Sequence, residues 1–429
     1  MRKYMRMFFL LVFILGILSA GMANAASPVI HVLQVDGTIV PVVADFIDQG
    51  ITEAENRGAA ALVIKLNTPG GLLAPTEAIV DRILNARVPV VVYVDRWAGS
   101  AGTFITLASH IAAMAPGSRI GAATPVVMGE EMPEEVRRKI TEDVAARVRS
   151  IAEMRGRDPE QAELTVREGK SFTDSEALEA NLIDLRADSL QDLISQLDGM
   201  EVTIHGKKII LNTEGYVLDE IEMTLIQRFL HAISDPNIAY ILLSIGSLGL
   251  ILELYSPGTI FPGVIGAISL LLAFYSLAVL DAYWAGTILI LLAFGLFATE
   301  VFVTSGGLLT AGGLASLIFG SLILFGGRPG MIGLQIDWWV IVIVAGAVTA
   351  FFAFIIQAVV RTQRRKQPTG QEALIGMVAE VKIALNPKGT VSVHGELWEA
   401  ILDRGKAEPG EEVTVTAVEG LKLRVTKYE

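Results

Sequence analysis

Five long apolar segments in the second half of the chain constrain its fold more than any other feature of the sequence. Each segment is long and apolar enough to cross a bilayer as a helix. The chain as a whole is 52% hydrophobic, which is too apolar for a purely soluble protein. We therefore predict a transmembrane domain over residues 238–360 with about five spans. The predicted spans lie near residues 238–255, 259–280, 284–303, 306–326 and 338–360.

The amino-terminal segment predicts that the α/β part of the chain after it is exported. Residues 1–26 combine early basic residues with an apolar run and end in the small-x-small pattern Ala23-Asn24-Ala25. This pattern is typical of a signal peptide, and an uncleaved anchor is the alternative. An odd number of spans then places the carboxyl terminus in the cytoplasm, and the basic cluster at 361–366 agrees with the positive-inside tendency. We predict a multi-pass protein of the cytoplasmic (inner) membrane.

Residues 27–200 alternate short apolar runs with helix-like segments, which predicts an exported α/β domain. A repeated order of strand, helix and strand implies parallel pairing, and ligands bind beyond the carboxyl ends of such strands. Residues 201–237 are interpreted as a linker. The predicted strands are 31–35, 60–66, 88–94 and 111–114, and the predicted helices are 42–56, 75–86 and 133–157.

Two glycine-rich loops come after the second and third predicted strands. They are 67–71 (Asn-Thr-Pro-Gly-Gly) and 99–102 (Gly-Ser-Ala-Gly), and both fall at the carboxyl edge of the sheet. A serine between small residues at a strand-to-helix turn has an exposed hydroxyl, which favours Ser100 as a nucleophile; a simple tight turn is the alternative. Backbone N–H groups of Gly70, Gly71 and Ala101 are the candidate stabilisers of an oxyanion.

The base that would activate Ser100 is less clear from the residues alone. His110 is nearly three helical turns away, roughly 15 Å at 1.5 Å per residue, and is interpreted as structural. A lysine can serve when burial lowers its pKa. Lys139 borders the apolar stripe of the predicted helix 133–157, while Lys170 and Lys65 are competitors.

Several classes of function are disfavoured by composition. The chain has no cysteine, which removes disulfides and thiolate sites, and its five histidines are scattered. We therefore predict neither a metal site nor a cofactor. A net charge of −12 gives no support for nucleic acid as a partner.

The carboxyl-terminal residues 361–429 return to a soluble composition. Alternating apolar runs separated by turn signals predict a small all-β, OB-like barrel. Within residues 370–429 acidic residues outnumber basic ones, and the segment lacks the basic, aromatic surface of an oligonucleotide binder. An interaction module is the favoured interpretation.

The membrane domain contains a weak internal sequence repeat, an internal echo, with an offset of 47 residues. Glu253 matches Glu300, and Gly266 matches Gly313, which suggests two similar helical hairpins. Both glutamates are expected at the headgroup level, and their role is left open.

A family resemblance adds to these interpretations. Together with the two glycine loops, three further motifs resemble the long form of the NfeD family, membrane-bound serine proteases related to signal peptide peptidase A and to the Clp fold. The resemblance implies a Clp/crotonase-like fold and a catalytic dyad of Ser100 with Lys139. Clp proteases carry a histidine in the segment matching 120–127, and this chain has none there. The further motifs are 115–122, 138–141 and 175–184.

The resemblance also implies a partner, a stomatin-like membrane protein whose hydrophobic segment is cleaved. Leu72, Leu73 and Trp97 would suit an apolar peptide substrate. We expect a homo-oligomer, a dimer or larger; whether Lys139 acts within its own chain stays open. The alternatives are a non-catalytic scaffold for stomatin-like proteins and a crotonase-type acyl-thioester enzyme, which export disfavours because coenzyme A esters are cytosolic.

Overall fold

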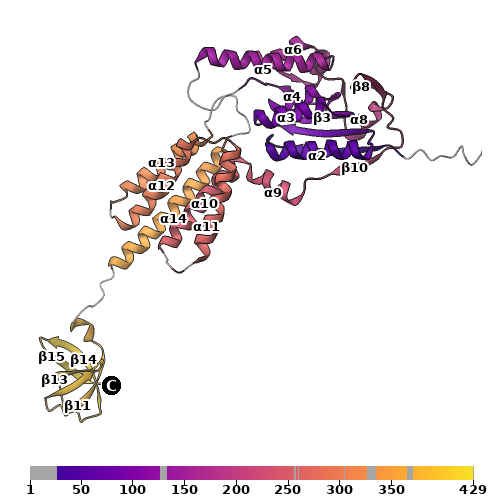
Figure 1. Ribbon diagram of the computed structural model, residues 1–429. Coiled ribbons are helices and arrows are strands. Elements are labelled where there is room, and N and C mark those ends of the chain that lie inside the picture. The colour runs from indigo at the N-terminus through magenta and orange to yellow at the C-terminus, as the bar shows by residue number, and fades with distance from the viewer. Residues whose placement is uncertain are drawn as a thin grey trace, which may run out of the picture. The chain divides into compact units, whose positions relative to one another are not determined.

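The computed structural model describes residues 27–125, 133–255, 258, 260–303, 305–325, 335–364 and 371–428. The chain divides into two compact units, Met1–Phe352 and Ala353–Glu429, each with its own hydrophobic core. The first unit contains an α/β domain and a set of apolar helices, and the second contains a β-barrel (Figure 1).

The α/β domain is built on a sheet whose central strands are parallel. The strand order is β10-β1-β2-β3-β4-β7, and each neighbouring pair in this order is parallel. β5 pairs in parallel with the carboxyl end of β3, and β6 pairs antiparallel with β5. The strands are β1 (Val29–Asp36), β2 (Ala61–Thr68), β3 (Val90–Ala98), β4 (Ile111–Met114), β5 (Arg119–Gly121), β6 (Ser171–Thr173), β7 (Leu185–Arg186) and β10 (Val217–Ile221).

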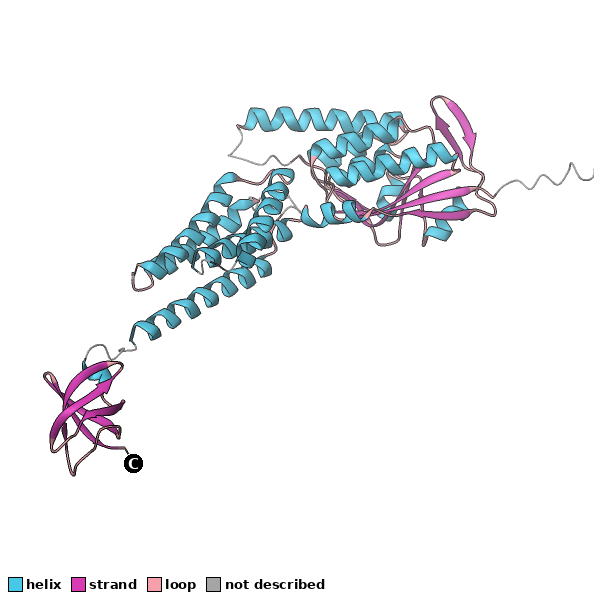
Figure 2. Ribbon diagram, turned by 60° about the horizontal axis from the view of Figure 1, so that its bottom comes forward, coloured by secondary structure: helices cyan, strands magenta, loops and turns pink. Residues whose placement is uncertain are grey.

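Both faces of the sheet are covered, which is why the central strands read as continuous apolar runs. Along β3, Val90 and Val92 face one core while Val91 and Tyr93 face the other. Figure 2 shows helices (cyan) packed along one face of the sheet (magenta). The first face packs on α2 (Pro41–Arg57), α3 (Leu73–Leu84), α4 (Ala101–Ala108), α5 (Glu134–Met154) and α6 (Pro159–Arg167), and the second on α8 (Leu190–Leu197) and the hairpin of β8 (Glu201–Ile204) with β9 (Lys207–Ile210).

The segment 201–237, interpreted from the sequence as a linker, is structured. It holds β8, β9, the edge strand β10 and the helix α9 (Leu225–Ile233), and β10 pairs with β1 from Val29 to Leu33. β9 is exposed along its whole length, so it lacks the apolar alternation that reveals a strand in the sequence. The α/β domain therefore extends beyond residue 200.

All five predicted apolar segments form helices. Three of them, α10, α11 and the Trp338–Ile355 part of α14, are long and apolar enough to cross a membrane. Within the described residues, α12 and α13 offer shorter apolar stretches, Trp284–Glu300 and Leu308–Leu324. The helices are α10 (Pro236–Tyr255), α11 (Ile260–Val279), α12 (Trp284–Phe302), α13 (Leu308–Leu324) and α14 (Trp338–Arg364).

The internal echo corresponds to two helical hairpins, α10–α11 and α12–α13, and the structure gives one glutamate a role. The carboxylate of Glu300 accepts hydrogen bonds from the N–H groups of Gly307 and Thr310, both at 3.0 Å, and thereby caps α13. Glu253 lies at the matching place beside α11, since a Cβ on Gly263 would be 2.9 Å from its Cγ.

The carboxyl-terminal unit is a closed barrel with strand order β11-β12-β13-β15-β14, preceded by the short helix η1 (Gln371–Leu374). Alternate residues of its strands, such as Val391, Val413 and Val425, form the core. The predicted fold class, an α/β domain with a helical membrane domain and a small β-barrel, is confirmed. The strands are β11 (Val378–Ile383), β12 (Lys388–Val393), β13 (Glu396–Leu402), β14 (Glu412–Glu419) and β15 (Lys422–Lys427).

Candidate active site

Ser100 occupies the turn between β3 and α4, and its backbone is strained. Its φ of 46° and ψ of −109° are a conformation that residues with a Cβ rarely adopt, so surrounding contacts must hold it. The N–H of Ser100 donates to the carbonyl of Ala122 at 2.8 Å, and its carbonyl accepts from the N–H of Thr103 at 2.9 Å. These bonds fix the turn and leave a half-buried side chain at the carboxyl edge of the sheet.

The glycine loop after β2 lies against this turn. Gly70 has a φ of 133°, and a Cβ placed on it would be 2.8 Å from the Cβ of Ser100. A Cβ on Gly71 would be 2.2 Å from the carbonyl oxygen of Ile39. Glycine is therefore required at both positions, because any side chain would meet a neighbour. As expected from parallel pairing, the two glycine loops share one site.

The three backbone groups considered for an oxyanion hole differ in their availability. The N–H of Gly70 donates to the hydroxyl of Thr68 at 3.0 Å, so it is already occupied. Among the described residues, no acceptor takes the N–H of Gly71 or of Ala101. Ala101 is the first residue of α4, where a helix leaves its N–H groups without intrahelical partners. Of the three N–H groups, those of Gly71 and Ala101 are thus the ones without an acceptor in the described part of the chain.

Two threonine hydroxyls shape the site, and sequence reasoning gave neither of them a role. Besides accepting from Gly70, the hydroxyl of Thr68 lies 3.0 Å from the carbonyl of Gly70. The hydroxyl of Thr103 donates to the carbonyl of Ala98 at 3.0 Å and accepts from the N–H of Gly121 at 3.1 Å. Both side chains are fully buried. The sequence signal for these roles was position, since Thr68 lies within the first glycine loop and Thr103 directly follows the second.

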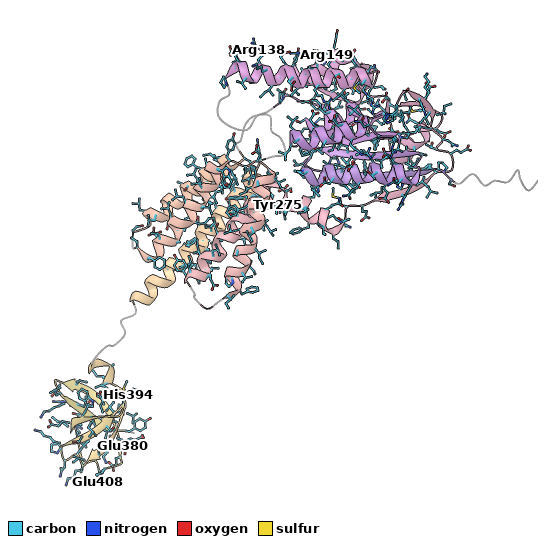
Figure 3. All side chains as sticks on the ribbon, viewed as in Figure 1. Arg138, Arg149, Tyr275, Glu380, His394 and Glu408 are labelled. Atoms are coloured by element: carbon cyan, nitrogen blue, oxygen red, sulfur yellow. The ribbon has the colours of Figure 1, made fainter. Side chains whose placement is uncertain are left out.

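Lys139 lies on the exposed part of α5. The helix packs on the domain through its carboxyl-terminal half, where Val144 and Val148 are buried, whereas its first turns are exposed. Arg138, labelled in Figure 3, marks this exposed end. In the part of the chain that the structure describes, no hydrogen bond or ion pair joins Lys139 to Ser100. The pairing of these two residues stays a prediction.

The other candidate bases are engaged elsewhere. Lys65 lies 3.6 Å from the carboxylate of Asp95, and the amine of Lys170 lies over the ring of Phe172 at 4.3 Å. His110 accepts a hydrogen bond from the N–H of the first residue of β3 at 3.2 Å, at the end of that strand opposite to Ser100. Burial, together with the nearby positive charges, lowers the pKa of His110 to about 3, which fits its structural interpretation.

The three apolar residues expected to contact substrate surround the glycine loops. Leu73 is exposed and Leu72 is half-buried. The ring of Trp97 lies against Gly99, whose Cβ would be 2.7 Å from it, and carries the guanidinium of Arg119 at 4.4 Å from the ring centroid. Trp97 is thus held in place, whereas Leu73 is open to a ligand.

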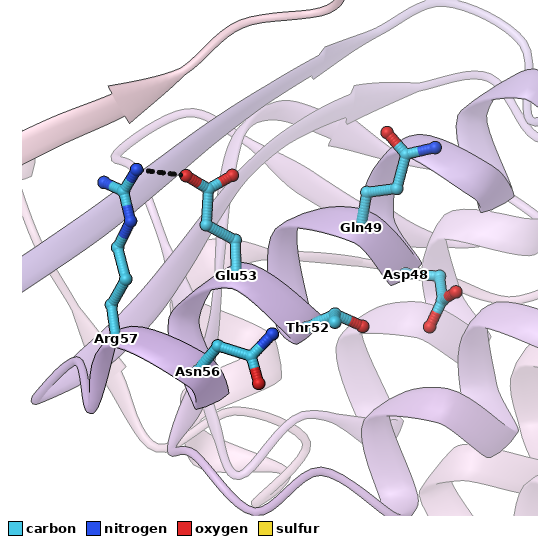
Figure 4. Close-up of a pocket in the computed structure, with 6 residues that line it drawn as sticks. All are labelled: Asp48, Gln49, Thr52, Glu53, Asn56 and Arg57. Atoms are coloured by element: carbon cyan, nitrogen blue, oxygen red, sulfur yellow. Dashed lines mark ion pairs between the residues drawn. The ribbon is translucent and has the colours of Figure 1, made fainter.

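Two cavities of the described part of the α/β domain are lined by residues other than Ser100. A groove of about 470 Å³ runs along the outer face of α2 (Figure 4), where all six lining residues come from one helix and Arg57 pairs with Glu53 at 2.8 Å. A cleft of about 800 Å³ includes Lys65, Asp95 and His231. Among the described residues, no group of three or more His, Cys, Asp or Glu side chains could hold a metal ion.

Three family models match successive parts of the chain. The N-terminal domain of NfeD1b matches residues 29–223, the NfeD integral membrane domain matches 237–358, and the NfeD-like C-terminal, partner-binding domain matches 371–427. The first match includes β10, in agreement with the extended α/β domain. Together with the apolar helices, the second identifies a membrane protein.

Two relatives match almost the whole chain. The membrane-bound protease PH1510 of Pyrococcus horikoshii is 34% identical over 94% of this chain and 94% of its own length. The membrane protein NfeD1b of Bacillus subtilis is 28% identical over 96% of each chain. Among solved structures, a mutant of the 1510-N membrane-bound stomatin-specific protease in complex with a substrate peptide is 32% identical, covering 48% of this chain and 98% of its own, with a TM-score of 0.46. The chain belongs to the NfeD family and has its long form, with N-terminal, membrane and C-terminal domains.

Proposed function

We propose that this protein is a membrane-anchored serine endopeptidase with Ser100 as its nucleophile. The observation that carries the proposal is the strained turn of Ser100 next to the N–H groups of Gly71 and Ala101, which have no acceptor among the described residues. Acyl transfer needs a nucleophile and oxyanion donors at one point. The name of the 34% identical relative, a membrane-bound protease, supports the same class of activity.

In the proposed reaction, the hydroxyl oxygen of Ser100 attacks the carbonyl carbon of a peptide bond while its proton passes to a base. The carbonyl oxygen becomes an oxyanion, which accepts hydrogen bonds from the N–H groups of Gly71 and Ala101. Collapse of this intermediate breaks the C–N bond, and the protonated base returns its proton to the leaving amine. Water then hydrolyses the acyl-enzyme by the same steps, with the base taking a proton from the water.

We assign the base to Lys139. To accept a proton near neutral pH, its amine must be shielded from solvent, because burial lowers the pKa of a lysine. The exposed first turns of α5 carry Val136, which is itself exposed, and Ile140, which is half-buried. A peptide or a second copy of the chain could pack on this apolar stripe. Such packing would shield the amine of Lys139 from solvent and so lower its pKa. A homo-oligomer is part of this proposal.

The substrate in this proposal is a hydrophobic segment of a membrane-associated protein, and a stomatin-like partner is the favoured source. The exposed Leu73 and half-buried Leu72 suit an apolar peptide next to Gly71. The family description of the C-terminal domain as partner-binding supports docking of a protein partner on the barrel. Proteolysis would then act on a protein held at the membrane.

The proposed topology places the α/β domain outside the cytoplasm and the barrel inside it, in the cytoplasmic membrane. The signal-peptide pattern of residues 1–26 lies outside the described part of the chain and supports export of the α/β domain. Five crossings by α10 to α14 would return the chain to the cytoplasm, and the basic residues near the end of α14 agree with this orientation.

Labelling with a fluorophosphonate tests the nucleophile, and cleavage of an apolar peptide from a stomatin-like carboxyl terminus tests the activity. With full-length protein in nanodiscs, we expect label on Ser100 alone. Ser100→Ala and Lys139→Ala should each lower turnover by at least about a thousandfold, because a nucleophile and its base act as a unit. Ser195→Ala and Arg138→Ala, which change exposed residues, are the matched controls.

Equal turnover in the wild type, Ser100→Ala and Lys139→Ala would refute the proposal. If a stomatin-like protein still bound to these variants while no cleavage product formed in the wild type, the non-catalytic scaffold would be the correct function. Loss of activity in Ser100→Ala but not in Lys139→Ala would keep the nucleophile and reject the base.

A further inference from the structure

The short helix α9 (Leu225–Ile233) carries an apolar face that no described residue covers at its amino-terminal end. Leu225 is 80% exposed, Ile226 72% and Phe229 50%. At 100° per residue these side chains fall on one side of the helix, together with Leu230 and Ile233. Exposure falls along this stripe towards the end of the helix, where Ile233 is buried. An exposed apolar face of this kind marks a site that binds a protein or a membrane.

The opposite side of α9 is fixed to the α/β domain. Thr224 and Gln227 form a capping box that begins the helix. The side-chain amide of the same Gln227 donates to the side chain of Gln49 at 3.0 Å, and Gln49 is drawn on α2 in Figure 4. A Cβ on Gly37 would be 3.7 Å from the ring of His231. Because the polar side already has protein partners, the apolar side is the one that remains free.

The carboxyl-terminal end of α9 joins the membrane helices directly. Only Ser234 and Asp235 separate it from α10, which begins at Pro236. The carbonyl of Ile233 accepts a hydrogen bond from the hydroxyl of Ser276. Ser276 lies about one turn inside the end of α11, which is Val279. The last turn of α9 is therefore level with the end of a membrane span.

Exposed aromatic residues mark this same end of the helices. The end of α13 bonds to the start of α12, through Leu324 and Tyr283 at 2.9 Å, and Asp337 bonds to Asn237 at 2.8 Å, next to the starts of α14 and α10. The starts of α10, α12 and α14 and the ends of α11 and α13 therefore lie at the same end of the helical domain. The aromatic belt there, of which Tyr275 is labelled in Figure 3, consists of Tyr275, Trp284, Trp338 and Trp339, all exposed.

Tyrosine and tryptophan gather where a bilayer meets water, so the aromatic belt places the lipid headgroups at the level where α9 ends. We infer that α9 is an interfacial helix, with Leu225, Ile226 and Phe229 buried in the headgroup and upper acyl region of the bilayer that α10 crosses. This depth is typical of amphipathic helices that lie on a membrane. Continuity with α10 favours the bilayer over a second copy of the chain as the occupant.

The charge on α9 also bears on the kind of lipid. Arg228 pairs with Glu222 at 3.3 Å, and its guanidinium donates to the carbonyl of Met223 at 3.0 Å. The positive charge of Arg228 is thus balanced by the negative charge of Glu222. Insertion is therefore driven by apolar burial, and it should not depend on anionic lipid. A consequence is that α2, through Gln49, is held near the membrane surface.

Site-directed fluorescence tests this placement, because the chain has no native cysteine. Single variants Leu225→Cys, Ile226→Cys and Phe229→Cys in the full-length protein are labelled with bimane and placed in phosphatidylcholine nanodiscs. Lipids that carry a nitroxide near the top of the acyl chain act as quenchers. We expect quenching at Ile226→Cys and Phe229→Cys to be at least about threefold greater than at Arg228→Cys, since exposed Arg228 lies about 160° and about 100° around the helix from these two residues, and only about 60° from Leu225.

Equal quenching on the two sides of α9, or none at any position, would overturn the inference. Added phosphatidylserine should leave the difference unchanged, and a strict need for it would also contradict apolar insertion. If Leu225→Cys instead formed disulfide-linked dimers and its label were shielded from water but not quenched by lipid, a second copy would be the occupant. The substituted side chains are exposed, so the variants keep the core, and size-exclusion chromatography verifies this.

Discussion

Gly70 and Ser100 are in direct contact across the carboxyl edge of the sheet. A Cβ on Gly70 would lie 2.8 Å from the Cβ of Ser100 and 3.4 Å from its hydroxyl oxygen. The two residues come from loops after adjacent parallel strands, β2 and β3, so the sheet itself brings them together. The space that glycine leaves open lies beside the hydroxyl and the free N–H of Gly71, where a substrate carbonyl would need to enter.

Replacing Gly70 by alanine should therefore disable the site. The new methyl group would press on Ser100, and a φ of 133° is one that L side chains rarely adopt. We expect the rate of fluorophosphonate labelling to fall by at least about tenfold, which corresponds to about 1.4 kcal/mol. Gly117→Ala is the matched control, because Gly117 also has a positive φ, 76°, but no atom within 4 Å of its Cβ position. Equal effects of the two substitutions would mean that backbone strain alone is responsible.

Thr68→Val should weaken catalysis through Gly70. The substitution keeps the shape of the side chain and removes the hydroxyl that accepts from the N–H of Gly70. An unpaired buried N–H costs about 1–3 kcal/mol, so the loop should shift to regain a partner and misplace the free N–H of Gly71. We expect kcat to fall by about tenfold with little change in KM. Thr68→Ser should restore kcat, and failure of this rescue would point to a packing effect.

The alternation of strands and helices predicted the α/β domain, because buried parallel strands leave long runs of β-branched residues such as those of β3. The edge strand β10 could not be predicted in this way, since its residues from Val217 to Ile221 are exposed or half-buried and show no clear alternation. Its place is fixed by long-range pairing with β1. Local pattern therefore reveals the centre of a sheet better than its margin.

The same distinction applies to the site. Parallel topology made it possible to predict that the loops containing Gly71 and Ser100 would meet, and the structure bears this out. The hydroxyl of Thr68 could not be assigned a role in this way, because its bond to Gly70 depends on the backbone path of the loop. The setting of Lys139 was equally inaccessible, since helical spacing shows which side of α5 is apolar but not how far along the helix the domain covers it.

The half-buried His110 should make the α/β domain less stable at acidic pH. Burial first, and then the charges of Arg155 and Arg157, lower its pKa from 6.5 to about 3. Between these values the unfolded chain binds a proton that the folded chain does not, so stability is complete above pH 6.5 and is lost as pH falls towards 3. The loss is at most about 1.4 kcal/mol per pH unit.

A substitution isolates this effect from the other titrating groups. In His110→Asn, the side-chain carbonyl can still accept from the N–H of Val90, but no proton binds. Urea unfolding of the α/β domain, followed by circular dichroism of the full-length protein, compares the two proteins at about pH 7.5 and about pH 5. We expect the parent to lose more stability than the variant over this interval, and identical losses would show that His110 is accessible to protons in the fold.

Glu300→Gln should destabilise the second membrane hairpin. The carboxylate of Glu300 accepts from the N–H groups of Gly307 and Thr310 and from the hydroxyl of Ser305 at 2.7 Å. The amide of glutamine has only one oxygen to accept from these three donors. Its NH2 group replaces the second oxygen and cannot accept a hydrogen bond. At least one donor then loses its partner, at a cost of about 1–3 kcal/mol.

Glu253→Gln is the comparison for this last experiment, since it lies at the equivalent position of the first hairpin. In the described part of the chain, one oxygen of its carboxylate is buried without a hydrogen-bond partner, so the substitution should cost less than at Glu300. Thermal unfolding of the two variants in the same detergent measures the difference, and the lower midpoint should belong to Glu300→Gln. The reverse order would indicate that Glu253, and not Glu300, holds its hairpin together.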